Sequence, residues 1–164
     1  MKTEIYKMSA LELSEAFKAK TLSPVEAINS VLERIKNIDE KLNAYVFIDE
    51  DLALKQAKES EIRWNNGNPK SKIDGVPTAI KDLLLTKDWP TMRGSKTVNK
   101  NADWKDDAPV TARLKESGAV LIGKTTTPEF GHKGTTQSPL TGITRNPWNV
   151  SYTSGGSSLS LIHI

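Results

Sequence analysis

Apolar residues recur at helical spacing through the N-terminal part of the chain. Ser9 and Glu12 are spaced as a capping box, which predicts a helix that begins there and runs to about Lys20. A second box at Ser23 and Glu26 has proline at the first helical position, which also favours a helix start. The predicted apolar faces are Leu13, Ala16 and Phe17 in the first helix, and Val25, Ile28, Val31, Leu32, Ile35 and Ile38 in the second. Two capped amphipathic helices are therefore expected.

The next two elements complete a mainly helical N-terminal part. Residues 43–48 are rich in strand-forming side chains and have polar neighbours, which predicts a strand. The segment from about residue 50 to residue 65 predicts a helix that ends at Asn66 and Gly67, because glycine is common just past a helix C-terminus. Residues 1–66 are therefore expected to be mainly helical.

From residue 67 onward the pattern changes to short apolar strands separated by helices and loops. Residues 78–85 predict one strand. Residues 107–114 predict a helix that stops at Gly118, and residues 119–122 form a continuous apolar run typical of a buried strand. Helix, glycine and apolar strand is the order found in α/β folds, so residues 67–158 are expected to be the start of an α/β core.

Two long polar connections separate these elements. Residues 86–107 and 125–149 show little periodicity and contain glycines and prolines. Connections of this length are more often functional than idle, and ligands of open α/β sheets bind beside the carboxyl ends of the strands. Since the second connection follows the strand at 119–122, we expect it to lie over that edge.

Composition and charge narrow the class of function. The 23 basic and 20 acidic residues are scattered, so the net charge of +3 includes no basic stripe of the kind that nucleic-acid binding requires. Cysteine is absent and histidine occurs twice, which excludes a disulfide framework and disfavours a metal site. No segment approaches membrane-spanning length. The sequence thus predicts a cytoplasmic protein with no cofactor, no metal, no membrane contact and no direct nucleic-acid partner.

Lys81 and the stretch Ser154–Ser158 are the candidate chemical groups. The apolar run before Lys81 would carry its ammonium group into the interior, and a lysine held out of water has a lowered pKa and can act as a base toward a hydroxyl. In the stretch, two glycines leave the backbone open beside two serine hydroxyls. Each feature has an ordinary alternative, because Gly-Ser segments are often linkers and lone lysines often extend to solvent.

One further motif is a misleading match. The segment Gly118–Thr125 fits the phosphate-loop pattern G-x-x-x-x-G-K-[ST] letter for letter. A phosphate loop needs a strand before the first glycine and a helix directly after the lysine. Here a helix is expected before Gly118, the intervening residues are the expected strand, and Pro128 disfavours an immediate helix. Nucleotide binding is therefore not expected.

Six separate blocks together resemble the amidase signature family. In chain order they are Gly75–Asp82, the helix at 107–118, Gly118–Thr125, Thr127–Gly131, Arg145–Asn149 and Gly155–Ser158. The resemblance implies an α/β fold with a mixed β-sheet covered by helices, and cleavage of carboxamides by a Ser, cis-Ser, Lys triad. It matches Lys81 to the triad lysine and Ser157 to the bridging cis-serine. Gly155, Gly156 and Thr135 would then contact the substrate.

The sequence departs from the family after Ser158. Family members continue with further glycines, a helix and a Gly-Gly-Ser whose serine is the nucleophile, and none of this follows here. Residues 159–164 form an apolar tail equal to the translation of a sequencing-library transposon end, so we expect a non-native tail. Residues 1–164 are therefore interpreted as an incomplete single amidase signature domain, inactive by itself. A naturally truncated gene is the alternative.

Three functions remain open at this level. The first is the N-terminal part of an amidase that hydrolyses small or aryl carboxamides, which the blocks at 127–131 and 134–136 favour. The second is the A subunit of a tRNA-dependent amidotransferase, which releases ammonia from glutamine and passes it to a partner subunit. The third is a non-catalytic binding module. The partners would be a small-molecule amide and a second copy of the chain, or the other subunits of an amidotransferase.

Overall fold

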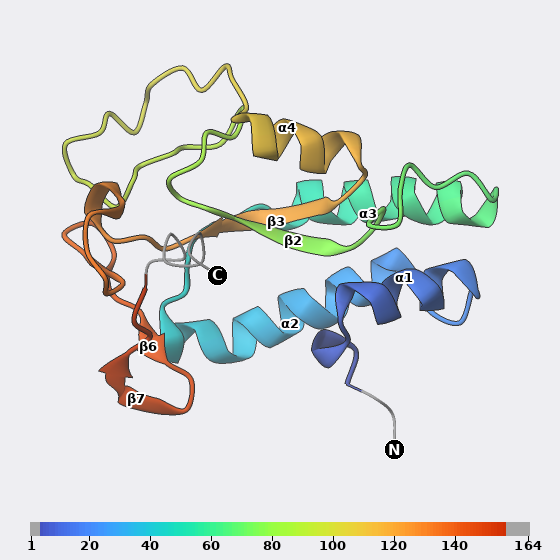
Figure 1. Cartoon of the computed structure of the whole chain (residues 1–164), viewed down its shortest axis with the longest axis horizontal. Coiled ribbons are helices and arrows are strands. Elements are labelled where there is room, and N and C mark those ends of the chain that lie inside the picture. Colours follow the sequence, from blue (N-terminus) through green and yellow to red (C-terminus); the bar gives the residue numbers. More distant parts are fainter. Residues whose placement is uncertain (1–3, 157–164) are drawn as a thin grey trace. The chain divides into compact units, whose positions relative to one another are not determined.

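The computed structural model describes residues 4–156 (Figure 1). The helices are α1 (Ala10–Lys18), α2 (Pro24–Leu42), α3 (Glu50–Asn65) and α4 (Pro109–Glu116), with short 3-10 helices at Ile5–Lys7 and Glu129–Gly131. The strands are β1 (Tyr45–Ile48), β2 (Pro77–Lys81), β3 (Val120–Thr125), β4 (Gln137–Ser138), β5 (Gly142–Ile143), β6 (Arg145–Asn146) and β7 (Asn149–Thr153). Ser157, Ser158 and the expected non-native tail at 159–164 lie outside the described residues.

Both predicted capping boxes form. At the start of α1, the Ser9 N–H donates to Glu12 Oε2 at 2.7 Å and the Glu12 N–H donates to Ser9 Oγ at 3.3 Å. At the start of α2, the Ser23 N–H donates to Glu26 Oε2 at 2.8 Å and the Glu26 N–H donates to Ser23 Oγ at 3.1 Å. These bonds satisfy amide groups that have no partner within the helix, which fixes where each helix begins.

The three longer strands before the hairpins form a mixed sheet in the order β1-β3-β2. The backbone hydrogen bonds that flank the pairs are Val120 N–H to Val76 O, Asp82 N–H to Thr125 O, Asp49 N–H to Ile122 O and Thr126 N–H to Ala44 O. The first two advance in the same direction along both chains, so β2 and β3 are parallel. The last two advance in opposite directions, so β1 is antiparallel to β3. The expected α/β class with a mixed sheet is thus confirmed.

Several element boundaries differ from the sequence prediction, and three of them concern β2, α4 and β3. Strand β2 ends at Lys81 rather than near Leu85, because the chain turns there and the Leu84 N–H donates to Lys81 O at 3.0 Å. Helix α4 begins at Pro109, two residues later than predicted. Strand β3 continues past the apolar run to Thr125, so the strand contains the buried Lys124. A charged residue at a buried strand position was not anticipated.

The chain divides into two compact units, which are described separately. One consists of residues 4–37, 48–79 and 112–123, and the other of residues 38–47, 80–111 and 124–156. A buried cluster in the first unit joins α1, α2 and α3, with the Phe17 and Trp64 rings 6.2 Å apart. Its buried members are Leu13, Phe17, Ala27, Trp64 and Val76. The predicted buried face of α1 is confirmed at Leu13 and Phe17.

A buried carboxylate connects α3 to the segment before β2 in the first unit. Asp74 is fully buried, and the Arg63 guanidinium donates to both of its carboxylate oxygens, at 2.6 and 2.8 Å. The Lys70 N–H also donates to this carboxylate at 2.8 Å, and the Trp64 indole donates to the Asp74 carbonyl at 2.9 Å. Gly118 has a φ of +85°, and a Cβ there would lie 2.6 Å from Asp74 Oδ1. Only glycine therefore fits at this helix end.

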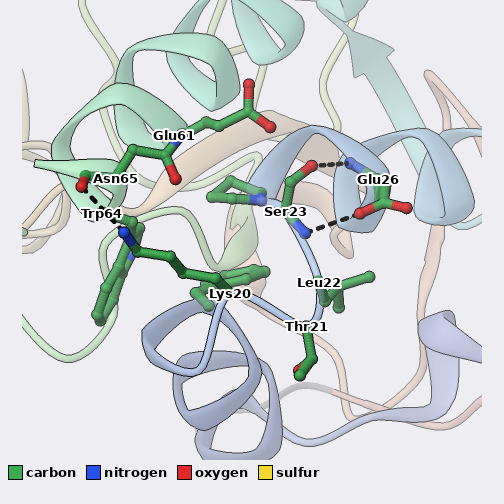
Figure 2. Close-up of a pocket in the computed structure, with 10 residues that line it drawn as sticks. Lys20, Thr21, Leu22, Ser23, Glu26, Glu61, Trp64 and Asn65 are labelled. Carbon is green, nitrogen blue, oxygen red and sulfur yellow. Dashed lines mark hydrogen bonds between the residues drawn. The ribbon is translucent and has the colours of Figure 1, made fainter.

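A cavity of about 130 Å³ lies in the first unit between the ends of α1 and α3 and the start of α2 (Figure 2). Figure 2 shows Lys20 donating to the carbonyl of Asn65 at 3.2 Å across the opening, next to the Ser23 and Glu26 capping box. These bonds join and cap helices. None of the site residues expected from the sequence lines this cavity.

The second unit contains the two long connections. Between β2 and α4 the chain forms neither helix nor strand, apart from an isolated bridge between Thr86 and Trp89. Residues 125–149, expected to be an ordered loop, contain the 3-10 helix Glu129–Gly131 and the antiparallel hairpin of β4 with β5. A second antiparallel hairpin, of β6 with β7, begins in this range and ends at Thr153. Strands of two residues carry too little periodicity to be read from a sequence. In the part of the chain that the structure describes, no helix has the length and apolar character needed to cross a membrane.

Candidate active site

Lys81 is the last residue of β2 and is half-buried. Burial lowers the pKa of Lys81 below its ordinary value, because the charged ammonium form loses solvation. The expected direction of this pKa shift is therefore confirmed. A lysine with a lowered pKa has a larger neutral fraction near neutral pH, and only the neutral amine can accept a proton.

The backbone on both sides of the Lys81 carbonyl is fixed by hydrogen bonds. The Leu84 N–H donates to Lys81 O at 3.0 Å and closes a turn directly after β2. The Asp82 N–H donates to Thr125 O at 2.9 Å and joins the start of this turn to the end of β3. Lys81 therefore projects from a strand end whose chain direction is set on both sides.

A buried ion pair lies at the same strand ends. Asp82 is 1% exposed and Lys124 is 0% exposed, with Lys124 Nζ 3.9 Å from Asp82 Oδ1. Lys124 Nζ also donates to Leu84 O at 2.8 Å and to the hydroxyl of Thr91. Burial lowers the pKa of Lys124 to about 8 although Asp82 opposes the shift, and burial raises the pKa of Asp82 although Lys124 and backbone amides oppose it. Each group is held by hydrogen bonds that compensate for lost solvent.

The Asp82 carboxylate also fixes the loop that follows the turn. The Met92 N–H donates to Asp82 Oδ1 at 2.9 Å, and the Gly94 N–H donates to Asp82 Oδ2 at 3.2 Å. Sequence reasoning missed both Asp82 and Lys124 as structural partners. The signal was available, because a lysine in an apolar strand run requires a buried partner of opposite charge.

The glycine stretch is anchored by the loop before β4. Gly155 O accepts two hydrogen bonds of 2.8 Å, from the Thr136 N–H and from Thr136 Oγ1. Gly156 has a φ of +134°, and a Cβ there would lie 2.6 Å from Thr136 Oγ1 and 3.8 Å from the carbonyl carbon of Thr135. The fold thus brings Thr135, Gly155 and Gly156 together, while Thr136, which the sequence did not single out, makes the contacts. Ser157 lies outside the described residues.

The phosphate-loop match is structural coincidence, as expected. Helix α4 precedes Gly118, the intervening residues belong to β3, and Lys124 is buried within that strand. The lysine donates to protein oxygen atoms rather than projecting beside a helix N-terminus. Within residues 4–156, no group of three or more His, Asp or Glu side chains is arranged to hold a metal ion.

A second cavity, which lies in the unit that contains Lys81, has an aromatic side chain in its wall. It measures about 410 Å³ and is lined by Glu129, Phe130, His132 and Lys133. Phe130 is 51% exposed and has a φ of +50°, a strained conformation for a bulky residue. Its N–H donates to Arg93 O at 2.8 Å, and the neighbouring Glu129 accepts from the Ser95 hydroxyl at 2.7 Å. These bonds hold the ring at the surface.

A comparison with known protein families covers the strand, the turn and the glycine stretch described above. The family model described as "Amidase" matches residues 26–158. The chain belongs to the amidase family. The match includes β2 with Lys81, strand β3 and the glycine stretch, so the resemblance inferred from the six sequence blocks is confirmed.

Individual amidase-family relatives are much longer than this chain. The A subunit of the glutamyl-tRNA(Gln) amidotransferase of Thermobifida fusca is 39% identical over 158 residues, which cover 95% of this chain and 31% of the relative. The corresponding protein of Geotalea daltonii is 40% identical over 155 residues, which cover 94% of this chain and 32% of the relative. A bacterial aryl acylamidase of the amidase signature family has a similar structure, with a TM-score of 0.89 and 33% identity over 95% of this chain and 32% of its own. The chain thus spans about a third of the length of these relatives.

Proposed function

We propose that this amidase-family chain is the N-terminal part of an enzyme that cleaves carboxamide C–N bonds with a Ser, cis-Ser, Lys triad. The observation that carries the proposal is Lys81, a half-buried lysine at a strand end with a pKa lowered by burial, inside the segment that the family model matches. Such a lysine is suited to act as a base toward a hydroxyl. Ser157 is the proposed relay, and the proposed nucleophilic serine is the one of the Gly-Gly-Ser that follows Ser158 in the family pattern and is absent from this sequence.

In the proposed reaction, the nucleophilic serine attacks the amide carbonyl carbon while its proton passes through the Ser157 hydroxyl to neutral Lys81. The tetrahedral intermediate then breaks at the C–N bond, and the departing amine takes the proton back along the same route. The acyl group stays on the serine until water attacks it by the same base relay. The products are a carboxylate and ammonia or an amine.

Lys81 suits this relay because its task needs two protonation states. As a base it must be neutral, which the lowered pKa of Lys81 favours. As the conjugate acid it must return the proton, which a pKa near the working pH permits. Gly155, Gly156 and Thr135 are the proposed substrate contacts, and Phe130 offers an apolar ring to an aryl or acyl group.

A second candidate is the A subunit of an amidotransferase that releases ammonia from glutamine for a partner subunit. The 39% and 40% identities to such subunits favour it. The short blocks at 127–131 and 134–136 favour the hydrolase. The chemical step is the same in both, so the two differ in substrate and in partner subunits. A cytoplasmic location, and a homodimer in the case of the hydrolase, belong to the proposal.

The first test uses a serine-directed fluorophosphonate on the full-length protein, meaning the product of the reading frame that continues past Ser158 into the family's Gly-Gly-Ser. We expect labelling of the full-length protein and none of residues 1–164. Absence of labelling in a folded full-length protein would favour the non-catalytic binding module.

The second test separates the two enzymes by substrate. We expect release of the aryl amine from an acyl anilide by the full-length protein alone. Turnover of glutamine that requires added partner subunits and glutamyl-tRNA, with no turnover of the anilide, would assign the chain to the amidotransferase.

Substitutions of Ser157 and of Lys81 should lower kcat non-additively, because the two residues are proposed to act in one proton relay. Ser157→Ala in the full-length enzyme is expected to lower kcat about 10³-fold, because Lys81 would then face a methyl group in place of the relay hydroxyl. The Lys81→Ala/Ser157→Ala double variant should lose little more than either single variant. Additive losses in kcat would show that the two residues do not form one relay.

A further inference from the structure

The buried pair Asp82 and Lys124 has no part in the proposed proton relay, yet its contacts lead to Lys81. Lys124 Nζ donates to Leu84 O at 2.8 Å, and the N–H of the same Leu84 donates to Lys81 O at 3.0 Å. Lys124 therefore holds one end of the turn whose other end is the backbone of Lys81. We infer that Lys124 is a positioning residue for Lys81, acting through the turn at residues 81–84.

The Asp82 and Lys124 pair also holds the loop that follows this turn. The Asp82 carboxylate accepts from the amides of Met92 and Gly94, at 2.9 and 3.2 Å. Lys124 donates to the hydroxyl of Thr91 at the start of the same loop. The buried Lys124 side chain of β3 thus forms hydrogen bonds both with the turn at residues 81–84 and with the loop that begins at Thr91.

The anchored turn also sets the direction in which the Lys81 side chain points. The bond from the Asp82 N–H to Thr125 O continues the pairing with β3 one residue past the end of β2. Adjacent residues in paired extended backbone point to opposite sides, so anchoring the Asp82 side chain in the interior directs the Lys81 side chain the other way. The two exposures agree with this geometry, because Asp82 is 1% exposed whereas Lys81 is half-buried. If the anchor were lost, the turn could relax and Lys81 would change both its position and its contact with water.

The effect on catalysis follows from how strictly a proton relay depends on distance. A displacement of about 1 Å caused by a remote substitution can lower a rate about 10²-fold. Greater contact with water would also raise the pKa of Lys81 toward its ordinary value, since burial is the cause of its lowering. Both changes would act on the chemical step and leave the substrate contacts in place.

The test compares Lys124→Met with Arg63→Met in the full-length enzyme. Each removes the cation of a buried ion pair, but the Arg63 and Asp74 pair lies in the unit that does not contain Lys81. Rates are taken per folded molecule, at 25 °C and without denaturant. This inference rests on the proposed role of Lys81, so Lys81→Ala is assayed in parallel.

For Lys124→Met we expect kcat to fall about 10²-fold with KM changed less than about threefold. The acid limb of its pH profile for kcat should move to higher pH. Arg63→Met should keep the kcat and the pH profile of the wild type. A kcat within about threefold of wild type and an unmoved acid limb in folded Lys124→Met would overturn the inference.

Thr91→Val supplies a milder variant if Lys124→Met does not fold. Valine keeps the branched shape but removes the hydroxyl that accepts from Lys124. We expect kcat to fall about three- to tenfold, with the acid limb moved in the same direction. Wild-type kcat and pH profile in this variant would count against the inference. An active Lys81→Ala would instead overturn the proposed function and this inference with it.

Discussion

Replacing Lys81 by alanine in the full-length enzyme is expected to lower kcat by about 10³-fold or more. Deleting the base of a coupled triad has effects of this size, because the nucleophile then keeps its proton. The substitution removes a half-buried side chain at a strand end and leaves the backbone bonds of the turn intact, so the fold should persist. Steady-state hydrolysis and circular dichroism of the same preparation check both expectations.

Lys87→Ala is the matched control for this prediction. Lys87 is an exposed lysine in the same compact unit, and the substitution keeps the bond that its backbone N–H donates to Asp107. We expect wild-type kcat for this variant. The wild type should also lose activity as the pH falls through the lowered pKa of Lys81, since protonation removes the base. Retention of most activity in Lys81→Ala would remove Lys81 from the mechanism.

Arg63→Met is expected to lower the free energy of unfolding by about 3 to 5 kcal/mol. The substitution leaves the Asp74 carboxylate buried with an uncompensated charge, and breaking a buried pair in this way costs about that much. Urea unfolding of the full-length variant and wild type measures the difference. Lys36→Met, which breaks the exposed pair with Glu50, should change stability by less than about 1 kcal/mol.

The pH dependence of this difference tests its cause. Burial alone would raise the pKa of Asp74, but the hydrogen bonds from Arg63 and from the Lys70 backbone outweigh it and lower the pKa. A carboxyl whose pKa is lowered on folding stabilises the protein above its unfolded pKa, and this contribution is lost as the pH falls through the folded value. The gap between wild type and Arg63→Met should therefore narrow in acid. A gap that is independent of pH would mean that packing, rather than charge, accounts for the loss.

The fold could be predicted from sequence wherever short-range rules decide it. The helices α1 and α2 begin where Ser9 and Ser23 are followed three residues later by Glu12 and Glu26, and both boxes form. Boundaries were missed where distant contacts decide them. Strand β2 ends at Lys81 because of a turn that Lys124 holds, and the hairpins after β3 have strands too short to leave a pattern.

The sequence by itself determined the family and the capped helices, because these depend on residue order and on neighbours within a few positions. It also put forward Lys81 as the candidate base, which stays a prediction. Only the tertiary structure decided which residues surround the candidate site. Lys124 and Leu84 are 40 positions apart, and Thr136 and Gly155 are 19 apart, so neither contact has a periodicity that a sequence could display. The burial that lowers the pKa of Lys81 likewise arises from packing of distant segments, since a side chain loses its water only when the whole unit has folded around it.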